Sequence, residues 1–219
     1  MITKKNMKIL VVSPHISDGV MMCGASMARL VEEKHIVYVM SLGPNAHVDV
    51  DNEVKASKII GFQVVHPRLR LNVGEYTAGQ CYTEILAKIK DLTPDVVVTV
   101  SAKEVQYDHQ VTYLATRNAV YYAPREVYWE SEIEYRPRMY VTDCIESFKF
   151  VRADSVCEVE SRHLLQKKEA MKVYDYVPEA GKGPHFDVVH DRDWVQALGT
   201  LRGLWTGFPY AEVFQREEI

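Results

Sequence analysis

Short runs of apolar, β-branched residues alternate with longer segments of helical period through the first 130 residues of the chain. The run from Lys8 to Ser13 (KILVVS) predicts a buried strand, and the run from Asp95 to Val100 (DVVVTV) predicts a central one. Such alternation is typical of βαβ units, in which crossover helices join parallel strands. We therefore expect an α/β fold built on a mainly parallel sheet.

The same patterns predict the remaining elements of this first part. Helices are expected at 18–34, from a cap at Asp51 or Asn52 to Ile60, around 82–89 and around 111–122, and further strands at 36–42, 62–65 and 126–130. Right-handed crossovers and the common doubly wound topology give a Rossmann-like three-layer fold with strand order 3-2-1-4-5.

After residue 131 the pattern changes. Short antiparallel strands are expected at 138–143, 148–152 and 155–159, followed by a helix at 160–176, a Gly- and Pro-rich loop at 178–184 and a last helix at 193–204. We interpret the chain as one domain over residues 1–219, with a core at about 7–131 and a small C-terminal annex at about 132–219.

Composition narrows the possible partners. The chain has 219 residues, 47% of them hydrophobic, and a formal net charge of -4 without a Lys/Arg cluster, which argues against nucleic acid or an anionic membrane as the main partner. Four cysteines without metal-type spacing, no signal peptide and no membrane span predict a cytoplasmic protein with reduced thiols. Small-molecule chemistry is the class that remains.

Two histidines and several carboxylates lie where strands one and four of the expected sheet end. Residues 14–18 leave the first strand and residues 103–109 leave the fourth, so His15, Asp18 and His109 are expected to converge at the topological switch point. Two imidazoles and one carboxylate with an open position are the ligands of a catalytic zinc site, or of non-haem iron(II).

Each residue also has an ordinary structural interpretation. Asp18 alone could cap a helix, and His109 alone could be a first-turn residue. No G-x-G-x-x-G or G-x-x-x-x-G-K-[ST] follows the first strand, so a nucleotide-binding function is disfavoured. The joint placement of the three residues favours the metal site.

Five short motifs occur in order along nearly the whole chain. They are SPHISDGVMMCG at 13–24, EVKASKIIG at 53–61, the segment 94–109 ending in QYDH, QKKEAMKVY at 166–174, and RG at 202–203 followed by YAEVF at 210–214. Together they resemble the LmbE/PIG-L family of zinc-dependent N-acetylglucosaminyl de-N-acetylases. The resemblance implies zinc or another divalent metal on His15, Asp18 and His109, an N-acyl amino sugar or related amide as substrate, and a homo-oligomer.

The chain departs from the family pattern at its catalytic positions. Ser17 stands where the family has an aspartate as general base, and Gln106 stands at the first histidine of its H-P-D-H motif. A serine hydroxyl cannot accept a proton near neutral pH, and an amide cannot shuttle one. Asp108 or Glu104 could replace the base. Asp108 could instead orient a neighbour, and we favour a solvated loop carboxylate for Glu104.

Two functions of different class follow. The first is a metal-dependent amidohydrolase of weak or altered activity, and the second is a catalytically impaired homologue that serves as a metal- or ligand-binding module. In the closing motif, Arg202 and Glu212 are expected to form a structural ion pair under the wall of the site rather than to contact substrate.

Overall fold

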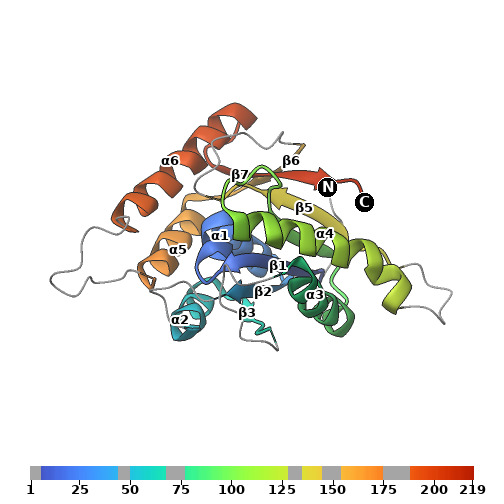
Figure 1. The fold of residues 1–219 in the computed structure, drawn as a ribbon. Helices are drawn as coiled ribbons and strands as arrows, with labels where there is room; N and C mark the ends of the chain where they lie inside the picture. The colour runs from blue at the N-terminus through green and yellow to red at the C-terminus, as the bar shows by residue number, and fades with distance from the viewer. Residues whose placement is uncertain (1–5, 44–49, 68–76, 128–134, 145–153, 175–187) are drawn as a thin grey trace.

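A computed structural model describes residues 6–43, 50–67, 77–127, 135–144, 154–174 and 188–219 of the chain. They form one sheet with helices packed on both faces, which gives three layers (Figure 1). The fold prediction is confirmed: the first five strands lie in the order 3-2-1-4-5, and antiparallel C-terminal strands extend the sheet.

The sheet has the order β3-β2-β1-β4-β5-β7-β6. Its parallel strands are β1 (Lys8–His15), β2 (Ile36–Gly43), β3 (Gln63–Val64), β4 (Val96–Val100) and β5 (Arg138–Thr142). Two antiparallel pairings attach β7 (Ala211–Glu217) to β5 and β6 (Ser155–Glu158) to β7. Because β1 pairs with both β2 and β4, its carboxyl end lies at the switch point between oppositely directed crossovers.

Six helices cover the sheet among the described residues. They are α1 (Asp18–Glu32), α2 (Val50–Ile60), α3 (Ala78–Leu92), α4 (Tyr107–Val127), α5 (Ser161–Lys172) and α6 (Val188–Thr206). Helices α3 and α4 pack together on one face, and α1, α2 and α5 pack on the other. Strand β1 has apolar side chains on both faces: Leu10 and Val12 point to the α3/α4 side, and Ile9 and Val11 point to the α1 side.

The predicted fifth strand at 126–130 is wrong where the structure describes it. Residues 126 and 127 belong to α4, and 128–130 lie outside the described residues. The buried helical stripe that includes Ala115, Ala119 and Ala123 runs up to this point, so the helix continues through it. The fifth strand is β5, which was predicted as an antiparallel annex strand but pairs in parallel with β4.

Smaller differences concern element ends and the C-terminus. Helix α2 begins at Val50, so Asp51 and Asn52 lie inside its first turn instead of capping it. Strand β7 was not predicted, although it joins β5 to β6. The strand expected at 148–152 and the loop expected at 178–184 lie outside the described residues.

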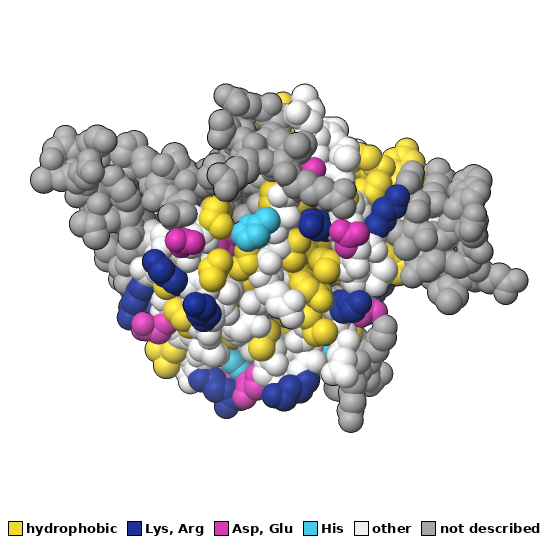
Figure 2. Space-filling model, turned by 90° about the horizontal axis from the view of Figure 1, so that it is seen from below, with side chains coloured by type: hydrophobic (Ala, Val, Ile, Leu, Met, Phe, Trp, Pro, Cys, Tyr) yellow, Lys and Arg dark blue, Asp and Glu magenta, His cyan; other side chains and the backbone are white. Residues whose placement is uncertain are grey.

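Two surface properties bear on possible partners. Within the described part of the chain, no helix combines the length and the hydrophobicity needed to cross a bilayer. Figure 2 shows the molecule from below, the side on which α2, β3 and α3 lie in Figure 1. On this face Lys and Arg side chains are interspersed with Asp and Glu rather than gathered into one basic field.

Candidate metal centre

The turn from β1 into α1 places His15 and Asp18 side by side. His15 is the last residue of β1, and Asp18 is the first residue of α1. Between them Ser17 has a φ of 87°, a conformation that non-glycine residues adopt at a cost and that turns the chain sharply into the helix. The turn is closed by Asp18 Oδ2, which accepts a hydrogen bond from the backbone N–H of His15 at 3.0 Å and lies 2.9 Å from His15 Nδ1.

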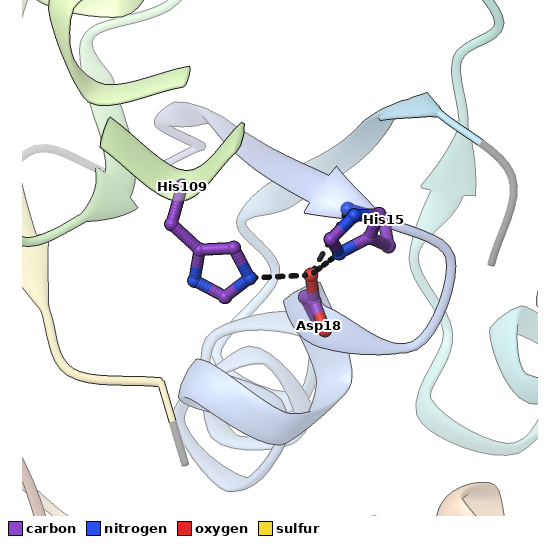
Figure 3. A group of neighbouring side chains, drawn as sticks. All are labelled: His15, Asp18 and His109. Carbon is purple, nitrogen blue, oxygen red and sulfur yellow. Dashed lines mark hydrogen bonds and ion pairs between the residues drawn. The ribbon is translucent and has the colours of Figure 1, made fainter. Parts of the chain in front are cut away.

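His109 approaches the same carboxylate from α4, the helix that follows the neighbouring strand β4. It lies in the first turn of α4, and β4 pairs with β1. Its Nε2 is 3.6 Å from Asp18 Oδ2, and its ring centroid is 5.4 Å from that of His15. Figure 3 shows both imidazoles pointing toward the Asp18 carboxylate, one from the end of β1 and one from α4.

The three side chains fit a divalent metal ion. One donor atom from each of His15, Asp18 and His109 lies within 4.8 Å of the other two. Ligands about 2.0–2.2 Å from a tetrahedral zinc ion are roughly 3.4 Å apart, so only small side-chain adjustments would be needed. Two neutral nitrogens and one carboxylate leave a fourth position for water or substrate.

Asp108 holds the far side of His15. Its Oδ2 is 2.7 Å from His15 Nε2, and its Oδ1 accepts the backbone N–H of His109 at 2.9 Å. Asp108 thus contacts the imidazole ring of His15 and the backbone of His109. An N–H on Nε2 would leave His15 Nδ1 as the nitrogen that faces Asp18 and the metal position.

The protonation of His15 depends on these two carboxylates. Burial lowers the pKa of His15, but the hydrogen bonds and negative charges of Asp18 and Asp108 outweigh burial, so the net shift is upward. Without a metal, the two carboxylates therefore stabilise the imidazolium form of His15 relative to an isolated histidine. A metal ion at Nδ1 competes with that proton.

Glu104 was predicted as a solvated loop carboxylate, and this is wrong. The residue is 1% exposed, and its Oε1 accepts the backbone N–H of Cys144 at 2.7 Å. Its Oε2 lies 3.5 Å from His109 Nδ1. In the sequence, Glu104 stands among Lys103, Val105 and Gln106, and no pattern in that loop distinguishes a buried carboxylate from an exposed one.

Comparison with protein families gives a direct match. Residues 10–120 match the model of the family described as PIG-L, GlcNAc-PI de-N-acetylase. The chain belongs to the PIG-L family. No curated protein matches the chain at a significant level.

Solved structures share the fold of this PIG-L protein at low sequence identity. The 4-carboxy-2-hydroxymuconate hydratase GalB from Pseudomonas putida KT2440 is 18% identical with a TM-score of 0.75, and the match covers 97% of each chain. The N,N'-diacetylchitobiose deacetylase from Pyrococcus horikoshii is 14% identical with a TM-score of 0.71 over 96% of this chain and 84% of the other. At these identities the matches establish the fold.

Ser17 and Gln106, the two catalytic positions singled out in the sequence, lie close to the triad in the chain. Ser17 is buried in the turn between His15 and Asp18, and its carbonyl accepts the N–H of Met21 at 3.0 Å. Gln106 lies just before α4, is half-buried, and accepts the N–H of Gln110 through its carbonyl at 3.1 Å. Neither side chain can accept a proton from water near neutral pH.

A buried carboxyl on α2 is a further polar group near the triad. Glu53 accepts a hydrogen bond from the Ser41 hydroxyl, which lies 3.0 Å from the Ser13 hydroxyl, and Ser13 in turn donates to the carbonyl of His15 at 3.2 Å. Burial raises the pKa of Glu53 to about 7, with a further contribution from the negative charge of Asp18. The motif comparison included Glu53, but its link to His15 is visible only in the structure.

The expected ion pair between Arg202 and Glu212 is replaced by two other pairs. Arg202 Nη2 lies 3.3 Å from Asp143 Oδ2, and Lys167 Nζ lies 2.5 Å from Glu212 Oε1. All four side chains are buried. Arg202 and Glu212 therefore each form a buried ion pair, but not with each other: Arg202 pairs with Asp143 and Glu212 pairs with Lys167.

Proposed function

We propose that the protein is a metal-dependent amidohydrolase of the de-N-acetylase type, acting on an N-acyl amino sugar or a related small amide. The convergence of His15, Asp18 and His109 at the switch point of a PIG-L chain supports this proposal. Zinc or another divalent metal would be held by these three residues. Bound there, it would polarise the acyl carbonyl and lower the pKa of a water molecule toward about 7.

The protein's own residues define what it adds to this chemistry. Asp18 carries the negative charge of the ligand set, and Asp108 holds His15 through Nε2. Both oxygens of Asp108 already accept hydrogen bonds, from His15 and from the backbone of His109, so Asp108 serves as an orienting group. Ser17 can hold a water molecule by its hydroxyl, and Gln106 can donate a hydrogen bond to a developing oxyanion.

A slow hydrolase follows from this assignment. General-base catalysis typically contributes about 10²- to 10⁴-fold, and Ser17 cannot supply it. We therefore propose weak or altered activity on simple N-acetyl amino sugars. The corresponding experiment loads the purified protein with zinc and measures amine release from a panel of N-acetyl amino sugars, beside the His109→Ala variant.

Amine release that exceeds that of His109→Ala supports the amidohydrolase. Stoichiometric metal binding with no amine release from any amide would instead favour the binding-module function. The three metal-binding side chains would then hold a metal without supporting amide hydrolysis. Absence of metal binding would reject the metal-dependent amidohydrolase and would leave only a module that binds a ligand other than a metal.

A second candidate is the hydration of a carbon–carbon double bond in a small unsaturated carboxylic acid. It rests on the structural similarity, over 97% of each chain, to a 4-carboxy-2-hydroxymuconate hydratase. Incubation with 4-carboxy-2-hydroxymuconate, followed by loss of its conjugated absorbance, separates this function from amide hydrolysis.

We also propose that the chain forms a homo-oligomer. Leu201, Leu204 and Trp205 occupy positions i, i+3 and i+4 of α6 and are exposed, Leu204 by 71% and Trp205 by 56%. Large apolar side chains grouped on one helical face support a protein contact there.

A further inference from the structure

Glu104 is a buried carboxylate in the loop between β4 and α4 that belongs neither to the triad nor to the departures from the family motif. A carboxylate withdrawn from water is costly unless hydrogen bonds or positive groups compensate it. The position of Glu104 therefore requires specific neighbours, and these neighbours define what it does.

Three contacts fix the place of Glu104. Its backbone N–H donates to the carbonyl of Ser101 at 3.2 Å, and its own carbonyl accepts from Gln110 Nε2 at 2.9 Å. Its Oε1 accepts from the backbone N–H of Cys144 at 2.7 Å. The carboxylate is thus held between the end of β4, the first turns of α4 and the segment that follows β5.

The second carboxylate oxygen faces His109. Glu104 Oε2 is 3.5 Å from His109 Nδ1, and within the described part of the chain Nδ1 is a buried nitrogen that forms no hydrogen bond of normal geometry. On the opposite edge of the ring, Nε2 is 3.6 Å from Asp18 Oδ2. The imidazole therefore lies between two carboxylates, with Nδ1 toward Glu104 and Nε2 toward the triad.

An ionised carboxylate can only accept hydrogen bonds, so a ring nitrogen that bonds to it must carry a proton. A neutral imidazole has only one such N–H. An N–H on Nδ1 directed at Glu104 leaves the lone pair on Nε2, the nitrogen that a metal at the triad would use. We propose that Glu104 is a positioning residue that holds His109 in the tautomer and orientation required of a metal ligand. This inference rests on the metal centre of the proposed function.

The same arrangement already exists on the other histidine, where Asp108 Oδ2 lies 2.7 Å from His15 Nε2. Each histidine of the triad would then have its own outer carboxylate. Asp108 belongs to the QYDH end of the segment 94–109, whereas Glu104 lies in the same segment just before QYDH.

The test substitutes Glu104→Gln, which keeps the size of the side chain and the acceptor for Cys144 N–H. With its amide oxygen on Cys144, the side chain turns an NH₂ group toward His109 Nδ1 and favours the opposite tautomer. Zinc affinity, measured by competition with a chelating dye, should fall about 10- to 100-fold. In the metal-free protein, ¹H–¹⁵N spectra of the imidazoles should show a smaller Nδ1–H population for His109 than in the wild type.

Glu84→Gln is the matched control, because Glu84 is also buried but lies on α3, outside the triad. It should leave both zinc affinity and the His109 spectrum unchanged. Equal zinc affinity and equal tautomer populations in Glu104→Gln and wild type would overturn the inference while leaving the metal centre intact.

The wild-type protein also tests the inference without a variant. If His109 in the metal-free wild type carries its proton on Nε2 only, Glu104 does not hold Nδ1–H and the inference is wrong, whether or not Glu104→Gln folds. A wild type that binds no zinc at all rejects the metal centre of the proposed function. The tautomer measurement remains informative in that case, so the two failures are distinguishable.

Discussion

Lys167 and Glu212 form a buried ion pair, with 2.5 Å between Nζ and Oε1, at the point where α1 is kinked. The kink lies at Cys23, whose φ and ψ of -148° and 28° interrupt the helix. After it, the N–H groups of Ala25 and Ser26 donate to the Glu212 carboxylate, the latter at 2.7 Å. Glu212 thus caps the second half of α1, and Lys167 balances its charge.

Lys167→Met is therefore expected to destabilise the fold. Removal of one partner leaves Glu212 as an uncompensated buried charge, which typically costs about 3–5 kcal/mol, here reduced by the N–H groups that remain on it. Urea unfolding measures the effect. The control Lys172→Met removes an exposed lysine of the same helix that pairs with Glu169, and should change stability by less than about 1 kcal/mol. Equal stabilities of the two variants would contradict the assignment.

Replacement of the histidines tests the metal centre directly. His15→Ala and His109→Ala each remove one of three ligands, so zinc retained after dialysis, measured by elemental analysis, should drop from near one equivalent to a small fraction. The exposed His66 gives a control, since His66→Ala should retain the metal. Undiminished zinc in the His15→Ala/His109→Ala double variant would reject the triad as the binding site.

The exposed face of α6 is the candidate for self-association. Leu204→Glu introduces a charge into that face and should convert the assembly to a smaller species in sedimentation velocity experiments. Leu114→Glu makes the same change at an exposed leucine of α4 and should leave the sedimentation coefficient unaltered. A wild type that is monomeric at micromolar concentration would refute the proposed homo-oligomer.

The three residues of the triad could be predicted from the sequence, because the order of strands and helices along the chain determines where they lie. Strand polarity and crossover handedness bring the ends of β1 and β4 together, and with them His15, Asp18 and His109. The same reasoning failed for β5, because residues 126–127 continue the helical period of α4 and no local signal shows that Arg138–Thr142 joins β4 in parallel.

Contacts between distant side chains had no sequence signature. Packing of its loop brings Glu104 into contact with the N–H of Cys144 and the ring of His109. Lys167 pairs with Glu212, which is 45 residues away in the sequence. Charged residues in loops and helices are usually exposed, so burial of these carboxylates depends on tertiary packing that local patterns do not encode.

The absence of a base at position 17 can be tested by supplying one. Ser17→Asp places a carboxylate between two residues of the triad, and aspartate tolerates the positive φ of this position better than most residues. Amine release from an N-acetyl amino sugar should rise, by up to about 10²- to 10⁴-fold. Gln106→His should add to the gain.

Ser17→Asn controls for shape, because asparagine tolerates the same backbone conformation but cannot take up a proton. Its amine release should stay near the wild-type rate. If Ser17→Asp changes little while Asp108→Asn abolishes turnover, Asp108 acts as a relocated base. Robust release by the wild type that is insensitive to both Asp108→Asn and Glu104→Gln would show that our reasoning about the base is wrong.

The buried carboxyl of Glu53 makes the stability of the metal-free protein depend on pH. Its pKa is about 7 in the folded protein, raised from 4.5 mainly by burial, so folding favours the neutral acid. The stabilisation is fully present below pH 4.5 and is lost as the pH rises through about 7. Above that pH Glu53 is ionised in both the folded and the unfolded protein, and the folded protein holds a buried charge.

Glu53→Gln removes this charge and keeps an acceptor for Ser41. At pH 8 in the presence of EDTA it should exceed the wild type in stability by on the order of 1–3 kcal/mol, with the difference shrinking toward pH 5, as measured by urea unfolding. A gain that is equally large at pH 5 would show that ionisation of Glu53 is not its cause.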